Sequence, residues 1–225
     1  MITKLTIDFL KDLKKNNTRE WFQENKKRYE ISHKEIYTFA DAIIEKLNQH
    51  DVIETPSGKK SMFRIYRDVR FSKNKEPYKT NRSGSFSRYG SDRRGGYYFS
   101  IEPGNSMIGG GFYAPNKEDL QLIRDQISLD AAPLRSVLEN KTFKSYFGSL
   151  QGEQLKTAPR GFEKDDPNID LLRFKNFYVM HRFTDEEVMS ENFIEQAMDG
   201  FLKILPFFDV MTEYLTTDLN GESVL

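Results

Sequence analysis

The spacing of apolar residues changes twice along the chain, and this change limits the fold more than any single motif does. Residues 1–50 and 193–205 carry apolar stripes at helical spacing, whereas apolar and polar residues alternate from Met62. A helical stripe buries one side of a helix, and a period of two buries one face of a strand. We therefore predict an α+β fold with a central, mainly antiparallel sheet flanked by N-terminal and C-terminal helices, in a single domain over residues 1–225.

Residues that cap helices indicate where the flanking helices begin and end. Thr18 is expected to start a helix from Arg19 to about Tyr29, separate from a third helix that buries residues 36–47. Pro206 is expected to kink or restart the last helix. The other expected caps are Thr6, Asn116, and Thr184 paired with Glu187 in a capping box.

Four stretches in the middle of the chain carry strand signals. GYYFSIEP (96–103) and SMIGGGFYA (106–114) predict two strands joined by a tight turn, and KNFYVMHRF (175–183) predicts another. Residues 62–72 alternate so that their charged side chains, except Arg67 on the apolar face, would share one face of a further strand. Residues 72–95, rich in Gly and Ser, are predicted to be a loop.

Composition excludes several classes of site. The chain contains no Cys, which excludes disulfides, Cys-ligated zinc, iron–sulfur clusters and thiol nucleophiles. His33, His50 and His181 are too scattered to predict a metal site. The N-terminal segment MITKLTIDFLKDLKK is interrupted by charges as in an amphipathic helix, and no apolar run approaches the roughly 20 residues of a membrane span. We expect a cytoplasmic protein without membrane contact.

Charge is segregated along a chain whose formal net charge is zero. Residues 59–94 hold 12 Lys and Arg against 3 Asp and Glu, a balance of +9, whereas residues 163–225 hold 5 against 14, a balance of −9. A local excess of this size indicates an anion-handling surface or an internal pairing of the two segments.

The centre of the basic segment is the candidate site. Guanidinium groups bind phosphate or carboxylate through paired N–H donors, and a tyrosine can stack on a base or donate a hydrogen bond. We therefore expect binding of a phosphate-bearing, nucleotide-like small molecule, with Asp68 as an orienting carboxylate if the site is an enzyme site. The candidate ligand-binding residues are Arg64, Tyr66, Arg67, Asp68, Arg70, Lys73, Lys75, Tyr78 and Lys79.

Two alternatives to this site stay open. In the first, Asp68 pairs with its flanking arginines, and the other cations are solvated or pair with the acidic C-terminal part, within one molecule or across a homo-oligomer. In the second, the basic segment binds nucleic acid. Nucleic acid ranks last because the acidic segment would repel a long polyanion, and because dedicated nucleic-acid binders usually have a basic domain.

Two other features favour structural roles. Gly109-Gly110-Gly111 precedes a predicted helix as a phosphate loop does, but the helix opens with Glu118 and Asp119, so a bulge or a close approach of another backbone is the preferred interpretation. His181 shares a strand face with apolar residues, so we expect a hydrogen-bonded core histidine and not a catalytic base.

Several motifs together resemble one family of proteins. They are NNTREWF (16–22), RIYRDVRFSKNKEPYKTN (64–81), YYFSIEPG (97–104), GGGFYAP (109–115) and PRGF (159–162). The chain from about Phe9 to Phe177 thereby resembles the conserved hypothetical proteins of domain of unknown function twenty-four sixty-one, although Asn74 stands where that pattern has Asp. The resemblance implies no reaction, substrate or catalytic residue.

Overall fold

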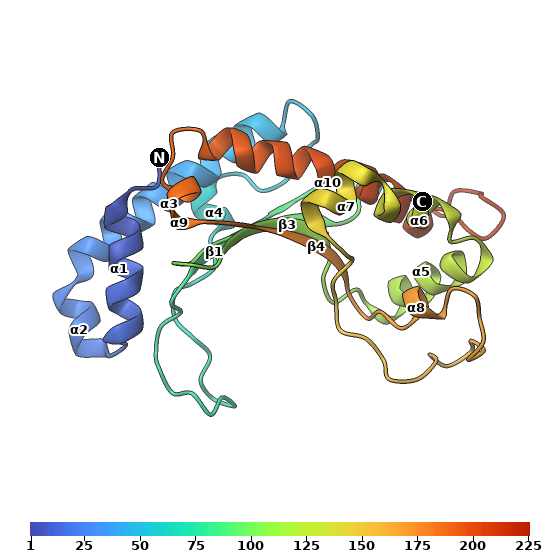
Figure 1. Cartoon of the computed structure of the whole chain (residues 1–225), viewed down its shortest axis with the longest axis horizontal. Helices are drawn as coiled ribbons and strands as arrows, with labels where there is room; N and C mark the ends of the chain where they lie inside the picture. Colours follow the sequence, from blue (N-terminus) through green and yellow to red (C-terminus); the bar gives the residue numbers. More distant parts are fainter. The chain divides into compact units, whose positions relative to one another are not determined.

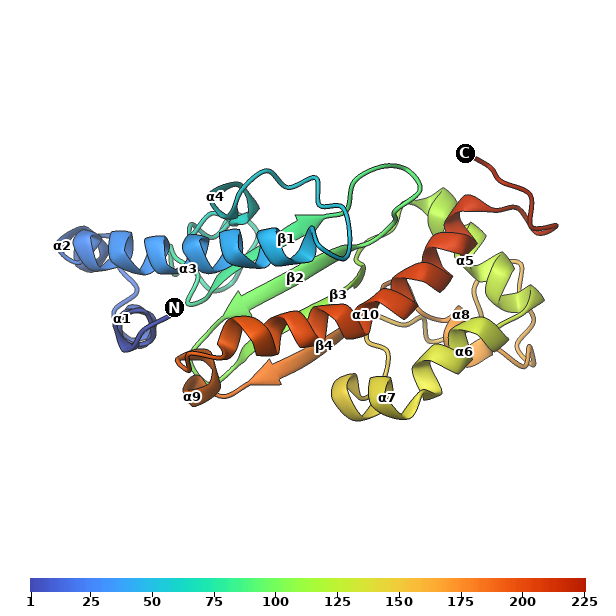
Figure 2. The ribbon, with the colours of Figure 1, turned by 90° about the horizontal axis from the view of Figure 1, so that it is seen from above.

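The computed structural model describes residues 1–225 and contains ten helices and one open four-stranded antiparallel sheet (Figures 1 and 2). The predicted α+β class is confirmed. The strands, in the sheet order β1-β2-β3-β4, are β1 (Arg82–Ser87), β2 (Gly96–Ile101), β3 (Ser106–Phe112) and β4 (Phe177–Phe183). The helices are α1 (Lys4–Lys15), α2 (Arg19–Glu24), α3 (Lys26–Leu47), α4 (Gly58–Ser61), α5 (Lys117–Leu129), α6 (Ala132–Glu139), α7 (Lys141–Phe147), α8 (Ile169–Leu172), α9 (Asp185–Val188) and α10 (Phe193–Thr216).

The residues group into two compact units. Unit 1 comprises residues 1–87, 98–108 and 182–199, and unit 2 comprises residues 88–97, 109–181 and 200–225. That the whole chain folds as one domain stays a prediction, and a single unfolding transition seen by independent probes would support it.

The core of unit 1 is built on α3. This helix packs against α1, α2, α4 and β1 (Figure 2). It buries one apolar stripe from Ile36 to Leu47. The ring of Phe39 stacks on that of Phe193 at 5.1 Å and meets the edge of Phe99, which stacks in turn on Phe86 at 5.4 Å. These aromatic contacts join the helix to the sheet within unit 1.

The first two helix boundaries differ from the predicted ones. Thr3, not Thr6, caps α1, because Thr6 is buried and its hydroxyl donates to Glu35. The predicted helix from Arg19 to Tyr29 is interrupted at Asn25, whose side-chain amide and backbone N–H both donate to the carbonyl of Trp21 and so end α2. The next residue starts α3, so the predicted second and third helices are divided at a different point.

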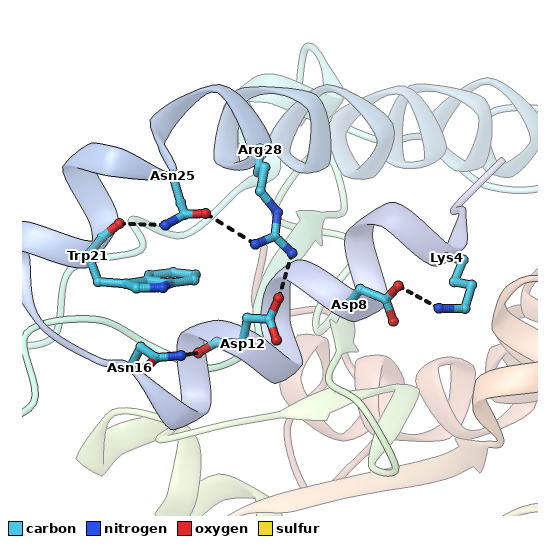
Figure 3. Close-up of polar contacts among 7 residues, drawn as sticks. All are labelled: Lys4, Asp8, Asp12, Asn16, Trp21, Asn25 and Arg28. Atoms are coloured by element: carbon cyan, nitrogen blue, oxygen red, sulfur yellow. Dashed lines mark hydrogen bonds and ion pairs between the residues drawn. The ribbon is translucent and has the colours of Figure 1, made fainter.

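The salt-bridged Arg28 connects α1 with the junction between α2 and α3 (Figure 3). The guanidinium of Arg28 donates to Asp12 Oδ2 at 2.7 Å and to Asn25 Oδ1 at 3.1 Å, and it lies 6.0 Å from the rings of both Phe9 and Trp21. Its charge is therefore balanced by a carboxylate, and its carbon skeleton covers aromatic surface.

The predicted strand over residues 62–72 is wrong. Residues 62–81 form a long loop, here called the 62–81 hairpin, which Figure 1 shows in teal projecting from β1. Its two arms meet only at isolated points, such as the Tyr66–Tyr78 bridge and the hydrogen bond from Arg67 N–H to the carbonyl of Pro77. Proline lacks an N–H, so a regular ladder cannot continue there.

Residues 82–87 form strand β1 inside the segment predicted to be a loop. Its sequence, RSGSFS, contains no branched aliphatic residue, so the usual strand signal is absent. Gly84 explains the pairing, because a Cβ there would lie 2.7 Å from the carbonyl oxygen of Ser61 and 2.8 Å from the ring of Phe99. The strand depends on this close approach within unit 1.

The outcomes of several other predictions can be seen in unit 2. Asn116 caps α5 through its side chain, and Arg124 of that helix donates to the carbonyls of Leu172 and Phe174. His181 makes the predicted hydrogen bond, 2.8 Å from the carbonyl of Tyr146, and its ring stacks on the Tyr146 ring at 3.8 Å, but the side chain is only half-buried. Helix α10 continues through Pro206 instead of restarting. In unit 1, the capping box of Thr184 and Glu187 is also present.

The triple glycine lies where two strands approach closely, as predicted. A Cβ added to Gly109 would overlap the carbonyl oxygen of Val179, and one added to Gly111 would overlap that of Phe177. These positions therefore accept no side chain without a shift of β4. None of the helices is long and apolar enough to cross a membrane.

Candidate anion site

Part of the predicted site is already neutralised inside the 62–81 hairpin. Arg70 forms a two-point contact with Asp68, at 3.0 Å from Nε to Oδ1 and 2.6 Å from Nη2 to Oδ2, and this contact keeps the pKa of Asp68 below its ordinary value. Arg67 pairs with Glu76 at 3.2 Å, and Lys75 donates to the carbonyl of Val69. The predicted pairing of Asp68 with a flanking arginine is confirmed.

The two tyrosines of the predicted site have different roles. Tyr78 is buried and stacks on Phe22 at 4.0 Å, and Asn17 holds its backbone N–H and carbonyl. Burial raises the pKa of its hydroxyl. Tyr66 lies 5.4 Å from that ring and is exposed, as is Lys73. Tyr78 anchors the hairpin, whereas Tyr66 remains accessible to a ligand.

Arg82, at the start of β1, is buried without a carboxylate. Only 2% of its surface is exposed. Nη2 lies 2.9 Å from His33 Nδ1, Nη1 lies 3.5 Å from the carbonyl of Phe63, and Nε has no hydrogen-bond partner. The guanidinium carbon lies 5.6 Å from the ring of Tyr29, so the charge has an aromatic neighbour but no anionic one.

Lys79 lies near Arg82, and Arg64 in turn lies near Lys79. Lys79 is half-buried, with Nζ 5.5 Å from the ring of Phe63, and Arg64 is exposed. Burial, followed by the charges of Arg64 and Arg82, lowers the pKa of Lys79. Neither Lys79 nor Arg64 forms a salt bridge, although the charge of Arg64 acts on Asp68, the partner of Arg70. We call Arg64, Lys79 and Arg82 the cation cluster.

The partner of Arg82 identifies the tautomer of His33. A guanidinium has five N–H donors and no acceptor, so Nδ1 of His33 must accept the hydrogen bond and the proton of the neutral ring lies on Nε2. The imidazole stacks on Tyr29 at 5.6 Å and meets the edge of Tyr37. Burial, and then the charges of Arg82 and Lys59, lower the pKa of His33. The ring therefore adds no charge near neutral pH.

Arg28 and Arg124 show two ways in which a guanidinium group away from water is compensated. Arg28 is balanced by Asp12 (Figure 3), and Arg124 donates to two main-chain carbonyls from two of its nitrogens. Removing a charge from water is costly unless a counter-charge and hydrogen bonds replace the water. Arg82 retains that cost, and burial accordingly lowers its pKa.

The titration of His33 predicts a pH effect on stability. Because its pKa is lower in the folded than in the unfolded protein, acidification from about pH 7.5 to 5.5 protonates the unfolded chain first and lowers the free energy of unfolding. His33→Asn keeps an acceptor near Arg82 but does not titrate. Denaturant unfolding at both pH values should show a smaller loss on acidification in the variant, and an equal loss in both proteins would contradict the prediction.

Arg82, His33 and Tyr29 were not predicted from the sequence as ligand-binding residues. Arg82 contributed to the charge count of the basic segment but was placed in a loop, and His33 lies 49 residues earlier on a helix. Nothing in their spacing links them, because the contact depends on how α3 packs against β1. No group of three or more His, Cys, Asp or Glu side chains is arranged to hold a metal ion.

Comparison with known proteins assigns the chain to a family. The family model described as "Conserved hypothetical protein (DUF2461)" matches residues 5–210. The chain belongs to the DUF2461 family. The family that the sequence resembles is thus confirmed. No curated protein and no solved structure matches the chain significantly.

Proposed function

We propose that this DUF2461 protein binds a phosphate-bearing small molecule, of the nucleotide-like class, at the cation cluster. The observation that carries the proposal is Arg82, a nearly buried guanidinium whose only close polar partners are a neutral imidazole and a carbonyl. Arg64 and Lys79 add two more positive charges, neither of which forms a salt bridge with a carboxylate. A bound anion would supply the missing counter-charge.

The proposal narrows the set of residues predicted from the sequence. Arg64, Lys79 and the exposed Tyr66 stay in the site, and Arg82 joins them. Arg67, Arg70 and Lys75 have partners inside the hairpin, so a ligand would have to replace existing contacts to use them. The rings of Phe63 and Tyr66 are exposed and would be available to contact an aromatic portion of the ligand.

Thermal unfolding against a ligand panel tests the proposal. The panel contains inorganic phosphate, sugar phosphates, nucleotides and short oligonucleotides, at low and moderate salt. A ligand at about 100 times its dissociation constant adds roughly 2.7 kcal/mol, which corresponds to about 5 to 10 °C for a protein of this size. Arg64→Ala and Lys79→Ala should lose most of the shift, whereas Arg70→Ala, whose guanidinium is held by Asp68, should retain it.

Other outcomes support the alternatives. Equal shifts in all three variants would remove the cation cluster as the binding site. A salt-dependent change of elution volume, lost in the same variants without any ligand effect, would favour pairing of the basic segment with the acidic residues 163–225 of a second copy. Steeply salt-dependent binding of oligonucleotides alone would favour nucleic acid.

A further inference from the structure

We infer that the ligand presents a terminal phosphate group, as in a phosphomonoester, and that the site discriminates against phosphodiesters. This inference rests on the proposed function and specifies the chemical class of its ligand. It follows from the burial of Arg82, from the charge of the cation cluster, and from the number of donors that the cluster offers.

Burial limits what can reach Arg82. Its side chain lies among Tyr29, His33 and Phe63, with only 2% of its surface exposed. A terminal group carries one substituent, so binding it end-on would require an opening on one side of the guanidinium only. The phosphorus of a diester is flanked by substituents on two sides, so both would have to fit beneath the covering side chains.

The positive charge of the cation cluster favours a dianionic ligand over a monoanionic one. Arg64, Lys79 and Arg82 carry one positive charge each, and His33 is neutral because Nδ1 accepts from Arg82. The other groups around His33 are Tyr29 and Tyr37 of α3 and the cationic Lys59 of α4, so no carboxylate faces this part of the cluster. A phosphomonoester carries about −1.5 to −2 at pH 7, whereas a diester carries about −1 and would leave more of the positive charge unbalanced.

The N–H donors of the cation cluster match the three free oxygens of a terminal phosphate better than the two of a phosphodiester. Arg82 has five N–H groups, of which one faces His33 and one the Phe63 carbonyl, and its Nε–H lacks an acceptor. Arg64 and Lys79 contribute separate donors from the 62–81 hairpin. A terminal phosphate offers three unsubstituted oxygens, one for each cation, whereas a diester offers two and leaves one cation without an anionic acceptor.

Matched ligands test this inference. Dissociation constants would be measured at about pH 8, where the monoester is a dianion, for inorganic phosphate against dimethyl phosphate and for adenosine 5′-monophosphate against its 5′-methyl ester. The wild type should bind the terminal phosphate of each pair at least about tenfold more tightly. Lys79→Ala should reduce the ratio of the two dissociation constants in each pair, because it removes one of the three cations. The control Arg70→Ala should keep the wild-type ratio.

The outcomes separate this inference from the proposed function. Equal affinities for both members of a pair, together with lost binding in Lys79→Ala, would overturn the preference for a terminal phosphate and leave phosphate binding intact. The preference for a terminal phosphate would also be overturned if the ratio of dissociation constants within each pair were the same in Lys79→Ala, Arg70→Ala and the wild type. A protein that binds none of the four probes, nor any member of the wider panel, contradicts both proposals.

Discussion

Arg82→Met is expected to raise the free energy of unfolding of the ligand-free protein by about 1 kcal/mol or more and to abolish its stabilisation by phosphate. Methionine has a similar length and is apolar, so it fills the space among Tyr29, His33 and Phe63 without a buried charge. A site that binds an anion keeps its cation unbalanced until the ligand arrives. Removing that cation should therefore stabilise the free protein and weaken the complex.

Arg28→Met is the matched control. Arg28 also lies beside aromatic rings in unit 1, but Asp12 balances its charge and both side chains are partly exposed. Its replacement should lower the free energy of unfolding by up to about 1 kcal/mol. Both variants would be compared with the wild type by denaturant unfolding with and without ligand. A loss of several kcal/mol in Arg82→Met alone would mean that Arg82 holds the fold together, which contradicts the proposed role.

Gly109→Ala is expected to destabilise the protein by about 3 kcal/mol or more, at the upper end of the cost of overpacking. The added Cβ would overlap the carbonyl oxygen of Val179 and the sulfur of Met180. A backbone carbonyl cannot rotate away as the end of a side chain can, so β4 would have to move. The cost should appear as a lower midpoint of denaturation.

Gly161→Ala separates this steric cost from backbone strain. Gly161 also lies in unit 2 and has a positive φ of 91°, but a Cβ there would have no heavy atom within 4 Å. Its replacement should therefore cost only the strain of a left-handed conformation, about 1 to 2 kcal/mol. If Gly109→Ala and Gly161→Ala lower the free energy of unfolding equally, the close approach of Val179 is not the reason why position 109 requires glycine.

Local signals predicted the elements that depend on their own residues. Thr18 and Asn116 cap helices because a side-chain oxygen of each accepts from a nearby backbone N–H, a contact that needs no other part of the fold. The turn between β2 and β3 and the aromatic-rich β4 were predicted for the same reason. The strand predicted from the alternation in residues 62–72 does not form, because a strand needs a neighbouring strand to pair with. In this segment only Met62 pairs with β1.

The amino-acid sequence by itself determined the α+β class, the family and the concentration of positive charge before β2. The tertiary structure decided which of those charges are balanced. Arg70 is neutralised by a residue two positions away, which a sequence can suggest, whereas the environment of Arg82 is built from α3 and from the base of the 62–81 hairpin. Burial and counter-charge depend on neighbours brought together by packing, and those two quantities distinguish an anion site from a solvated basic surface.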